Sequence, residues 1–180
     1  PMPALLAGHS LGEYAALVAA NTLAFADAIS LVRFRADAMQ AAVAEGVGAM
    51  AAILGLDDNI VREVCREAAQ GDVVEAVNLN SPGQVVIAGH KAAVERAMAL
   101  ALEKGAKRAL ALAVSVPSHS TLMLPAAEKL SLHLQSVKLL PPTIPVLHNT
   151  DVACHDDAAS IREALVRQLH TPVRWTETIR

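Results

Sequence analysis

The sequence predicts an α/β fold that carries a small α+β insert in its middle third. Three observations lead to this prediction. Of the 180 residues, 53% are hydrophobic and 18% are charged, which is enough apolar surface for a substantial core. Aromatic residues supply only 2%, so we expect small aliphatic contacts between helices and a sheet. Finally, apolar stretches with the period of strands alternate along the chain with stretches of helical period.

The start of the chain contains the first part of the α/β core. Residues 3–8 (PALLAG) are a short apolar run that we expect to form a buried strand. Residues 11–23 are mostly small and apolar and predict a helix, and residues 25–43 predict a second helix with interspersed charges. A strand is therefore expected to run directly into a helix near residue 10.

The middle third has the clearest periodicity. The order is strand, helix, strand, strand, helix and strand, over residues 48–56, 57–71, 73–80, 84–90, 91–105 and 107–116. Gly71 and Gly105 follow the two helices as stop signals, and the turn SPG joins the two central strands. This β-α-β-β-α-β order is typical of a ferredoxin-like subdomain.

The remaining residues return to the core. We expect a helix over residues 123–137, a Pro-rich crossing with a strand in it (LLPPTIPVLHNT), and a last helix ending near His170. The predicted division is an α/β core formed by residues 1–45 and 114–180, and a ferredoxin-like subdomain formed by residues 46–113.

Charge and composition exclude several classes of function. The formal net charge is −3 with acids and bases mixed, so we expect neither a nucleic-acid partner nor a membrane surface. No apolar run is long enough to span a bilayer, and the start lacks the charged region of a signal peptide. Cys65 and Cys154 lie far apart and are expected to be free thiols, which suits a cytoplasmic protein.

The stretch GHSLGEY contains a Gly-x-Ser-x-Gly motif between the first predicted strand and helix, which is the setting of a nucleophile elbow. The turn is sharp, so we expect Gly8 and Gly12 to be required for their lack of bulk. Ser10 would project its Oγ from the turn, and the backbone N–H of Leu11 would face an oxyanion formed there. The alternative is an ordinary turn in which Ser10 caps the helix.

A nucleophilic serine needs a general base, and the chain has seven histidines. His119 stands out because it follows a predicted strand in SVPSHSTLM, and α/β folds place their chemistry in loops at strand ends. His9 adjoins the serine and is expected to point elsewhere. No acid stands out as the third member of a triad.

A second cluster of polar residues, near the C-terminal end of the sequence, raises the possibility of a metal site. His148, Asp151 and His155 could serve as ligands. Their stretch has the composition of a loop, so we expect these side chains to lie on a solvated surface.

With Ser10 and His119 in view, the sequence resembles the malonyl-CoA:acyl-carrier-protein transacylase family of fatty-acid synthesis. Six blocks carry the resemblance in the family's order: GHSLGEYAALVAA, RFRADAMQ, GVGAMAAILGL, NLNSPGQVVIAG, VSVPSHSTLM and RQLHTPVRW. The resemblance implies a hydrolase-like α/β core with a nucleophile elbow and an inserted ferredoxin-like subdomain. The form VPSH around His119 resembles the stand-alone enzymes more than polyketide-synthase modules.

The resemblance also implies roles for single residues. Ser10 matches the serine that accepts the acyl group, and His119 matches its general base. Arg35 matches the arginine that holds the substrate carboxylate, whereas Arg33, two positions earlier on the helix, is expected to point nearly the opposite way. Gln168 matches a glutamine near the histidine, where amide or backbone contacts replace a triad acid. Surface positions are the alternative for both Arg35 and Gln168.

Two further matches concern the substrate side. Leu11 would supply one oxyanion N–H, and Asn80 and Gln84 match a block near the site, of which Asn80 is a substrate-binding candidate. Turn chemistry is the alternative for Asn80 and Gln84. The implied substrates are malonyl-CoA and an acyl carrier protein, joined through a malonyl-serine intermediate. The resemblance implies no metal and no cofactor beyond the coenzyme A thioester, and it leaves methylmalonyl open as the acyl group.

The chain departs from the family at both ends. Family members begin with a Gly-Gln-Gly segment that supplies a second oxyanion N–H, and they continue beyond the block that ends in VRW. We therefore expect a piece of a longer enzyme, with uncovered sheet edges and poor activity on its own. The alternatives are an inactive fragment, a serine hydrolase of the esterase or lipase kind, and an acyltransferase domain from a larger synthase.

Overall fold

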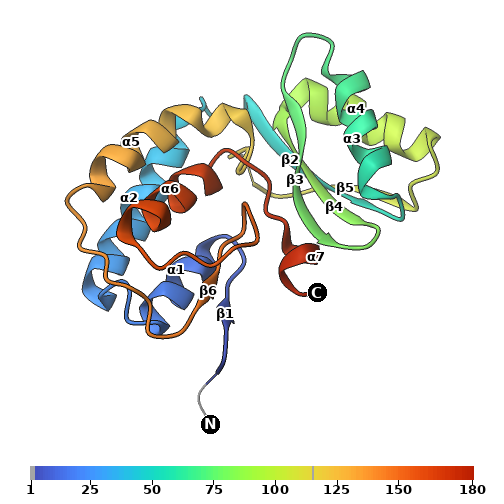
Figure 1. Ribbon diagram of the computed structural model, residues 1–180. Coiled ribbons are helices and arrows are strands. Elements are labelled where there is room, and N and C mark those ends of the chain that lie inside the picture. The colour runs from blue at the N-terminus through green and yellow to red at the C-terminus, as the bar shows by residue number, and fades with distance from the viewer. Residues whose placement is uncertain (1–2, 115) are drawn as a thin grey trace.

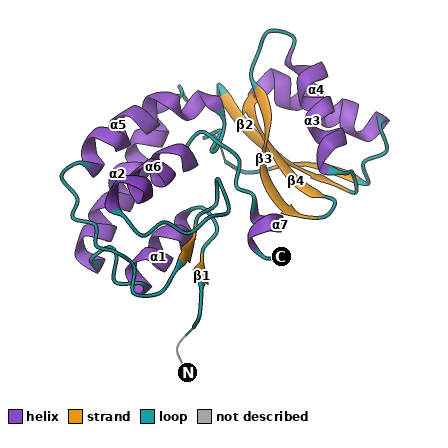
Figure 2. Ribbon diagram, in the orientation of Figure 1, coloured by secondary structure: helices purple, strands orange, loops and turns teal. Residues whose placement is uncertain are grey.

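The computed structural model describes residues 3–114 and 116–180 and folds into two lobes joined side by side (Figure 1). One lobe is mostly helical, and the other is an antiparallel sheet with two helices on one face (Figure 2). The mixed α/β fold predicted from the sequence is therefore confirmed.

The helical lobe takes elements from both ends of the chain. It contains β1 (Leu6–Ala7), α1 (Leu11–Ala19), α2 (Phe25–Ala42), a 3₁₀ turn (Thr121–Met123), α5 (Leu124–Leu134), β6 (Val146–Leu147) and α6 (Ala158–Gln168). Strands β1 and β6 pair in parallel, with Leu6 opposite Val146 and Ala7 opposite Leu147. Because both strands end at the same edge, the residues that follow each of them meet there.

The other lobe is built from consecutive elements. These are β2 (Gly48–Leu54), α3 (Asp58–Ala69), β3 (Val74–Ser81), β4 (Gln84–His90), α4 (Lys91–Glu103) and β5 (Arg108–Ala111). The strand order is β3-β4-β2-β5, with all neighbours antiparallel. Side chains alternate along the strands as the period of 2 requires: Ile53 and Ile87 pack toward α3 and α4, whereas Met50 and Val86 form a small cluster on the opposite face.

Each lobe has its own hydrophobic core of small aliphatic side chains. The first core joins α1, α2, α5 and α6 through fully buried leucines such as Leu17, Leu31, Leu130 and Leu165. The second core lies between the sheet and its two helices. Among the described residues, the largest fully buried side chains other than Tyr14 are aliphatic or Met, as the aromatic content of 2% predicts.

The lobes meet along β3. The segment after α6 runs beside this strand, where Leu79 N–H donates to the Val173 carbonyl and Val173 N–H donates to the Val77 carbonyl. A short helix, α7 (Trp175–Thr178), then packs on β3 and was not expected from the sequence. Near the start of β3, the Glu75 carboxylate accepts hydrogen bonds from the backbone N–H and the hydroxyl of Thr121, in the 3₁₀ turn. These contacts fix the loop that carries His119.

One predicted strand is longer than the observed one. Residues 107–116 were expected to be extended, but β5 pairs with β2 only over Arg108–Ala111, and Ser115 lies outside the described residues. Leu110, Leu112 and Val114 are all exposed, and the last backbone bond to β2 is that of Leu112 N–H to the Met50 carbonyl. In the part of the chain that the structure describes, no helix is both long and apolar enough to cross a membrane.

Candidate active site

The turn between β1 and α1 has a strained backbone. Ser10 has φ 51° and ψ −108°, which L residues rarely adopt outside functional turns. Gly8 is required here, because a Cβ on it would lie 2.0 Å from the Gly12 carbonyl oxygen. The expectation that Gly12 is also required is wrong, because a Cβ on Gly12 would meet no heavy atom within 4 Å.

The turn presents Ser10 Oγ to two side chains. Nε2 of His119 lies 2.8 Å from Oγ, and Nη2 of Arg35 lies 3.2 Å from it. Arg35 comes from the middle of α2, and His119 comes from the loop before the 3₁₀ turn, where its own φ is 63°. Residues from three separate segments therefore meet at one oxygen atom.

The imidazole of His119 is held in one orientation. Its Nδ1 donates to the backbone carbonyl oxygen of Gln168 at 2.6 Å, which leaves Nε2 to accept the proton of Ser10. A main-chain carbonyl thus takes the place of the carboxylate in a Ser-His-Asp triad. Burial lowers the pKa of His119 to about 3, with an opposing contribution from the Gln168 bond and a smaller lowering by the charge of Arg35. The ring is therefore neutral near pH 7 and able to accept a proton.

Arg35 is a buried cation, and no acidic partner for it occurs among the described residues. Its side chain donates to Ser10 Oγ and, at 3.1 Å, to Gln168 Oε1, and no carboxylate among the described residues lies within ion-pair distance of it. Its Nε is also buried without a hydrogen-bond partner in that part of the chain. Arg33, by contrast, is exposed and pairs with Asp37. A buried guanidinium that lacks a carboxylate partner favours binding of a ligand that carries a carboxylate.

A buried carboxylate that the sequence analysis missed lies behind this group. Glu13 is 0% exposed and is bonded at 2.7 Å to Nδ1 of His148. Its other oxygen accepts from the backbone N–H of Asn149 at 3.0 Å and from Nε2 of Gln168 at 2.9 Å. An acid on the apolar face of a predicted helix, three residues after Ser10, was the signal that could have found it.

Asn149 was also missed, and it ties the elbow to the end of β6. Its Oδ1 accepts from the backbone N–H of Ser10 at 2.7 Å, and its Nδ2 donates to the Gly8 carbonyl at 2.8 Å. The polar pair His148–Asn149 directly after an apolar strand could have indicated this, because parallel strands β1 and β6 end at the same edge.

The remaining predicted residues lie at the start of α1 and around the turn between β3 and β4. The backbone N–H of Leu11 begins α1 and has no acceptor among the described residues. Asn80 is half-buried, and its Oδ1 accepts from Nε2 of His9 at 2.9 Å. His9 therefore points toward β3, as expected. Gln84 is exposed at the start of β4 and accepts from the Ser81 hydroxyl, which is turn chemistry.

The expectation of a solvated surface around His148 is wrong. His148 is fully buried, because its Nδ1 and the following backbone N–H satisfy the Glu13 carboxylate. Asp151 and His155 are bonded to each other at 3.0 Å and are partly exposed. No group of three or more metal-ligating side chains occurs among residues 3–114 and 116–180.

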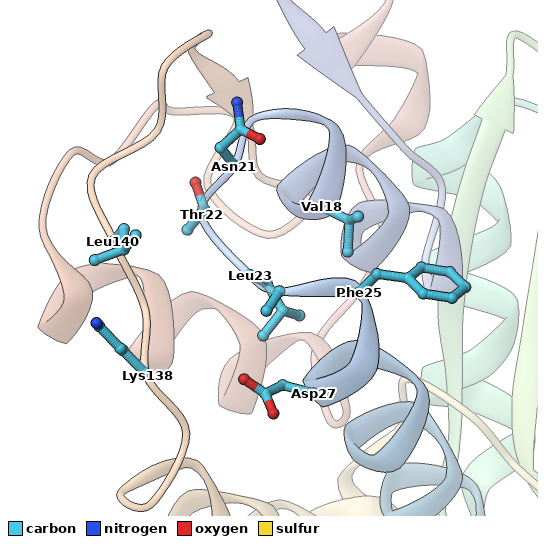
Figure 3. Close-up of a pocket in the computed structure, with 9 residues that line it drawn as sticks. Val18, Asn21, Thr22, Leu23, Phe25, Asp27, Lys138 and Leu140 are labelled. Atoms are coloured by element: carbon cyan, nitrogen blue, oxygen red, sulfur yellow. The ribbon is translucent and has the colours of Figure 1, made fainter.

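Two cavities adjoin α1, the helix that begins after Ser10. A cavity of about 520 Å³ is lined by Thr22, Phe25 and Lys138 at the far end of α1, and it contains none of the residues around Ser10 (Figure 3). A smaller apolar cavity of about 240 Å³ lies between α1 and α2, with Leu11 and Tyr14 in its wall.

Comparison with known proteins gives concordant matches. The whole chain, residues 1–180, matches the acyl transferase domain family. The malonyl CoA-acyl carrier protein transacylase of Salmonella typhimurium is 60% identical over 178 residues. The solved structure of the malonyl CoA-acyl carrier protein transacylase of Coxiella burnetii superposes with a TM-score of 0.99 at 51% identity. A malonyl-transacylase solved in complex with its type II PKS acyl-carrier protein superposes with a TM-score of 0.98 at 56% identity.

These matches cover unequal shares of the two chains compared. Each includes 99% of the present chain, but 58% of the Salmonella protein, 57% of the Coxiella chain and 58% of the chain from the complex. The chain therefore spans a little more than half the length of the relatives it matches.

Gly8→Ala tests the steric basis of the elbow. Because the added Cβ would lie 2.0 Å from a backbone oxygen, the variant should lower the free energy of unfolding by about 3 kcal/mol or more, measured by urea titration with circular dichroism. Gly12→Ala is the matched control and should change it by no more than about 1 kcal/mol, since the space beside Gly12 is open. Equal effects of the two substitutions would contradict this account of the turn.

The depressed pKa of His119 predicts the pH dependence of Ser10 reactivity. Only the neutral ring can accept the Ser10 proton, so the rate of Ser10 modification by a fluorophosphonate should show no inflection near pH 6.5 and should fall only as the pH approaches about 3. Intact-protein mass spectrometry gives the rate, and circular dichroism at each pH identifies the range in which the chain stays folded. A rate that halves near pH 6.5 would show that the ring is protonated at its ordinary pKa.

Proposed function

The chain belongs to the acyl transferase domain family, and we propose that it transfers a malonyl group from coenzyme A to the phosphopantetheine thiol of an acyl carrier protein in fatty-acid synthesis. The observation that carries the proposal is Arg35, a buried guanidinium 3.2 Å from the Ser10 hydroxyl with no carboxylate partner among the described residues. A guanidinium binds a carboxylate through two parallel hydrogen bonds, so it selects an acyl group that ends in a carboxylate.

The first half of the reaction loads the serine. Nε2 of His119 accepts the Ser10 proton while Oγ forms a bond to the thioester carbonyl carbon. The tetrahedral intermediate then expels the coenzyme A thiolate, which takes the proton from His119. The Gln168 carbonyl keeps the imidazolium oriented throughout, since Nδ1 remains bonded to it. The products are malonyl-Ser10 and free coenzyme A.

The second half runs through the same groups in reverse. The phosphopantetheine thiol gives its proton to His119 and attacks the ester carbonyl, and Ser10 leaves with that proton. In both halves the negative charge on the carbonyl oxygen needs N–H donors, and the unbonded Leu11 N–H at the start of α1 is the donor that this chain offers.

The comparisons support the choice of substrates. The Salmonella and Coxiella relatives carry the names of malonyl CoA-acyl carrier protein transacylases, and another neighbour was solved with its carrier protein bound. We propose the cytoplasm as the setting, and we infer that β2 to β5 with α3 and α4 form a ferredoxin-like subdomain over residues 46–113. The element order and the strand order β3-β4-β2-β5 support that inference.

Acylation of Ser10 is the direct test of the proposal. After brief mixing with malonyl-CoA, intact-protein mass spectrometry of the chain should show one malonyl adduct, and Ser10→Ala should show none. A wild-type chain that stays unmodified would contradict the proposal for this chain. Rapid hydrolysis of simple esters without preference for malonyl thioesters would identify a serine hydrolase instead.

Arg35→Lys tests the selection of a carboxylated acyl group. Lysine keeps the charge but offers a single point of contact, so the rate of malonyl adduct formation should fall about 10- to 100-fold, with a smaller change for acetyl-CoA. The matched control is Arg33→Lys, an exposed position on the same helix, which should change neither rate. Parallel losses for the two thioesters would argue that Arg35 does not read the carboxylate.

A further inference from the structure

We propose that Glu13 is a positioning residue that orients the Gln168 side chain and, through it, holds Arg35 ready for the substrate carboxylate. The proposal rests on the proposed function, in which Arg35 selects malonyl. Glu13 itself touches neither Ser10 Oγ nor the nitrogen atoms of Arg35 within hydrogen-bond or ion-pair distance.

The side-chain amide of Gln168 has only one orientation that satisfies its neighbours. Its Nε2 donates to Glu13 Oε2 at 2.9 Å and to the Ser10 carbonyl at 3.1 Å, and its Oε1 accepts from Arg35 at 3.1 Å. A flipped amide would place its oxygen against two acceptors and its NH₂ group against a guanidinium. The Glu13 carboxylate and the Ser10 carbonyl together fix which end of the amide faces Arg35, and Glu13 is the charged acceptor of the two.

The same arrangement separates the buried carboxylate of Glu13 from the buried guanidinium of Arg35. Three donors occupy the Glu13 carboxylate, from His148, Asn149 and Gln168, and the Gln168 amide stands between Glu13 and Arg35. The guanidinium is thus bonded to a neutral oxygen rather than neutralised by a carboxylate. Its charge remains available for the acyl group of the substrate.

The alternative role for Glu13 is purely structural, in which its hydrogen bonds stabilise the fold without affecting Arg35. A merely structural residue would lower the fraction of folded chain and thereby reduce malonyl and acetyl adducts together. A positioning residue for Arg35 would reduce the malonyl adduct selectively. The ratio of the two acylation rates, and the malonyl-CoA concentration at half-maximal rate, therefore distinguish the two roles.

Three variants make the test. Glu13→Leu removes the acceptor, and Glu13→Gln is the conservative replacement. The glutamine oxygen can still accept from Gln168 and Asn149, while its NH₂ group donates to Nδ1 of a His148 ring whose proton has moved to Nε2. Glu128→Leu, an exposed acid on α5, is the matched control for removal of a helical glutamate.

Glu13→Leu should reduce the malonyl-to-acetyl rate ratio about tenfold and raise the half-maximal malonyl-CoA concentration. Glu13→Gln should restore most of the ratio, and Glu128→Leu should leave it at the wild-type value. A folded Glu13→Leu chain with the wild-type ratio, or a Glu13→Gln chain as impaired as Glu13→Leu, would overturn the proposal.

A second measurement needs neither turnover nor a folded Glu13→Leu variant. In ¹⁵N-edited NMR spectra of the wild-type chain, the Gln168 side-chain NH₂ protons should exchange with water far more slowly than those of the exposed Gln40 and Gln84. Exchange as fast as at these two residues would overturn the proposal. A chain that shows slow exchange but forms no malonyl adduct would instead contradict the proposed function, while the fixed Gln168 amide on which the positioning depends would stand.

Discussion

A carboxylate removed entirely from water must be surrounded by donors, and much of this structure follows from meeting that requirement at Glu13. The donors come from the loop after β6 and from the end of α6, segments that lie more than 130 positions away in the sequence. Packing alone could leave α1, β6 and α6 free to shift by small amounts. The fixed directions of these hydrogen bonds set the register of the three elements, and Ser10 and Gln168 take their positions from it.

Ser10, His119 and Arg35 are each held by a main-chain or amide contact rather than by an ion pair among the described residues. Asn149 anchors both sides of the elbow, the Gln168 carbonyl orients His119, and the Gln168 amide bonds to Arg35. The charge of Arg35 consequently has no carboxylate partner among the described residues, which is costly in a folded protein. The helical lobe provides most of these contacts, and the contacts along β3 hold the loop of His119 against it.

The sequence predicted those features that depend on the residue pattern within one helix, strand or turn. The period-2 and period-3.6 patterns of the middle third predicted β2 to β5 and their helices to within a few residues, except for the end of β5, where the chain leaves the sheet edge. Ser10 and His119 were predicted from their local setting, Arg35 and Gln168 only from the family resemblance, and the structure brings the four together. His148, by contrast, was assigned to the surface, and Glu13 and Asn149 were missed. Their burial depends on a parallel pairing of β1 with β6, two strands of two residues each that no local pattern specifies.

The positive φ angles of Ser10 and His119 have a consequence for how such a sequence is maintained. Glycine would adopt either conformation without strain, whereas serine and histidine hold it at the expense of folding free energy. The two positions to which we assign the proposed chemistry are therefore also positions where another residue would give greater stability. Selection for thermal robustness alone would therefore favour glycine over serine and histidine at these two positions.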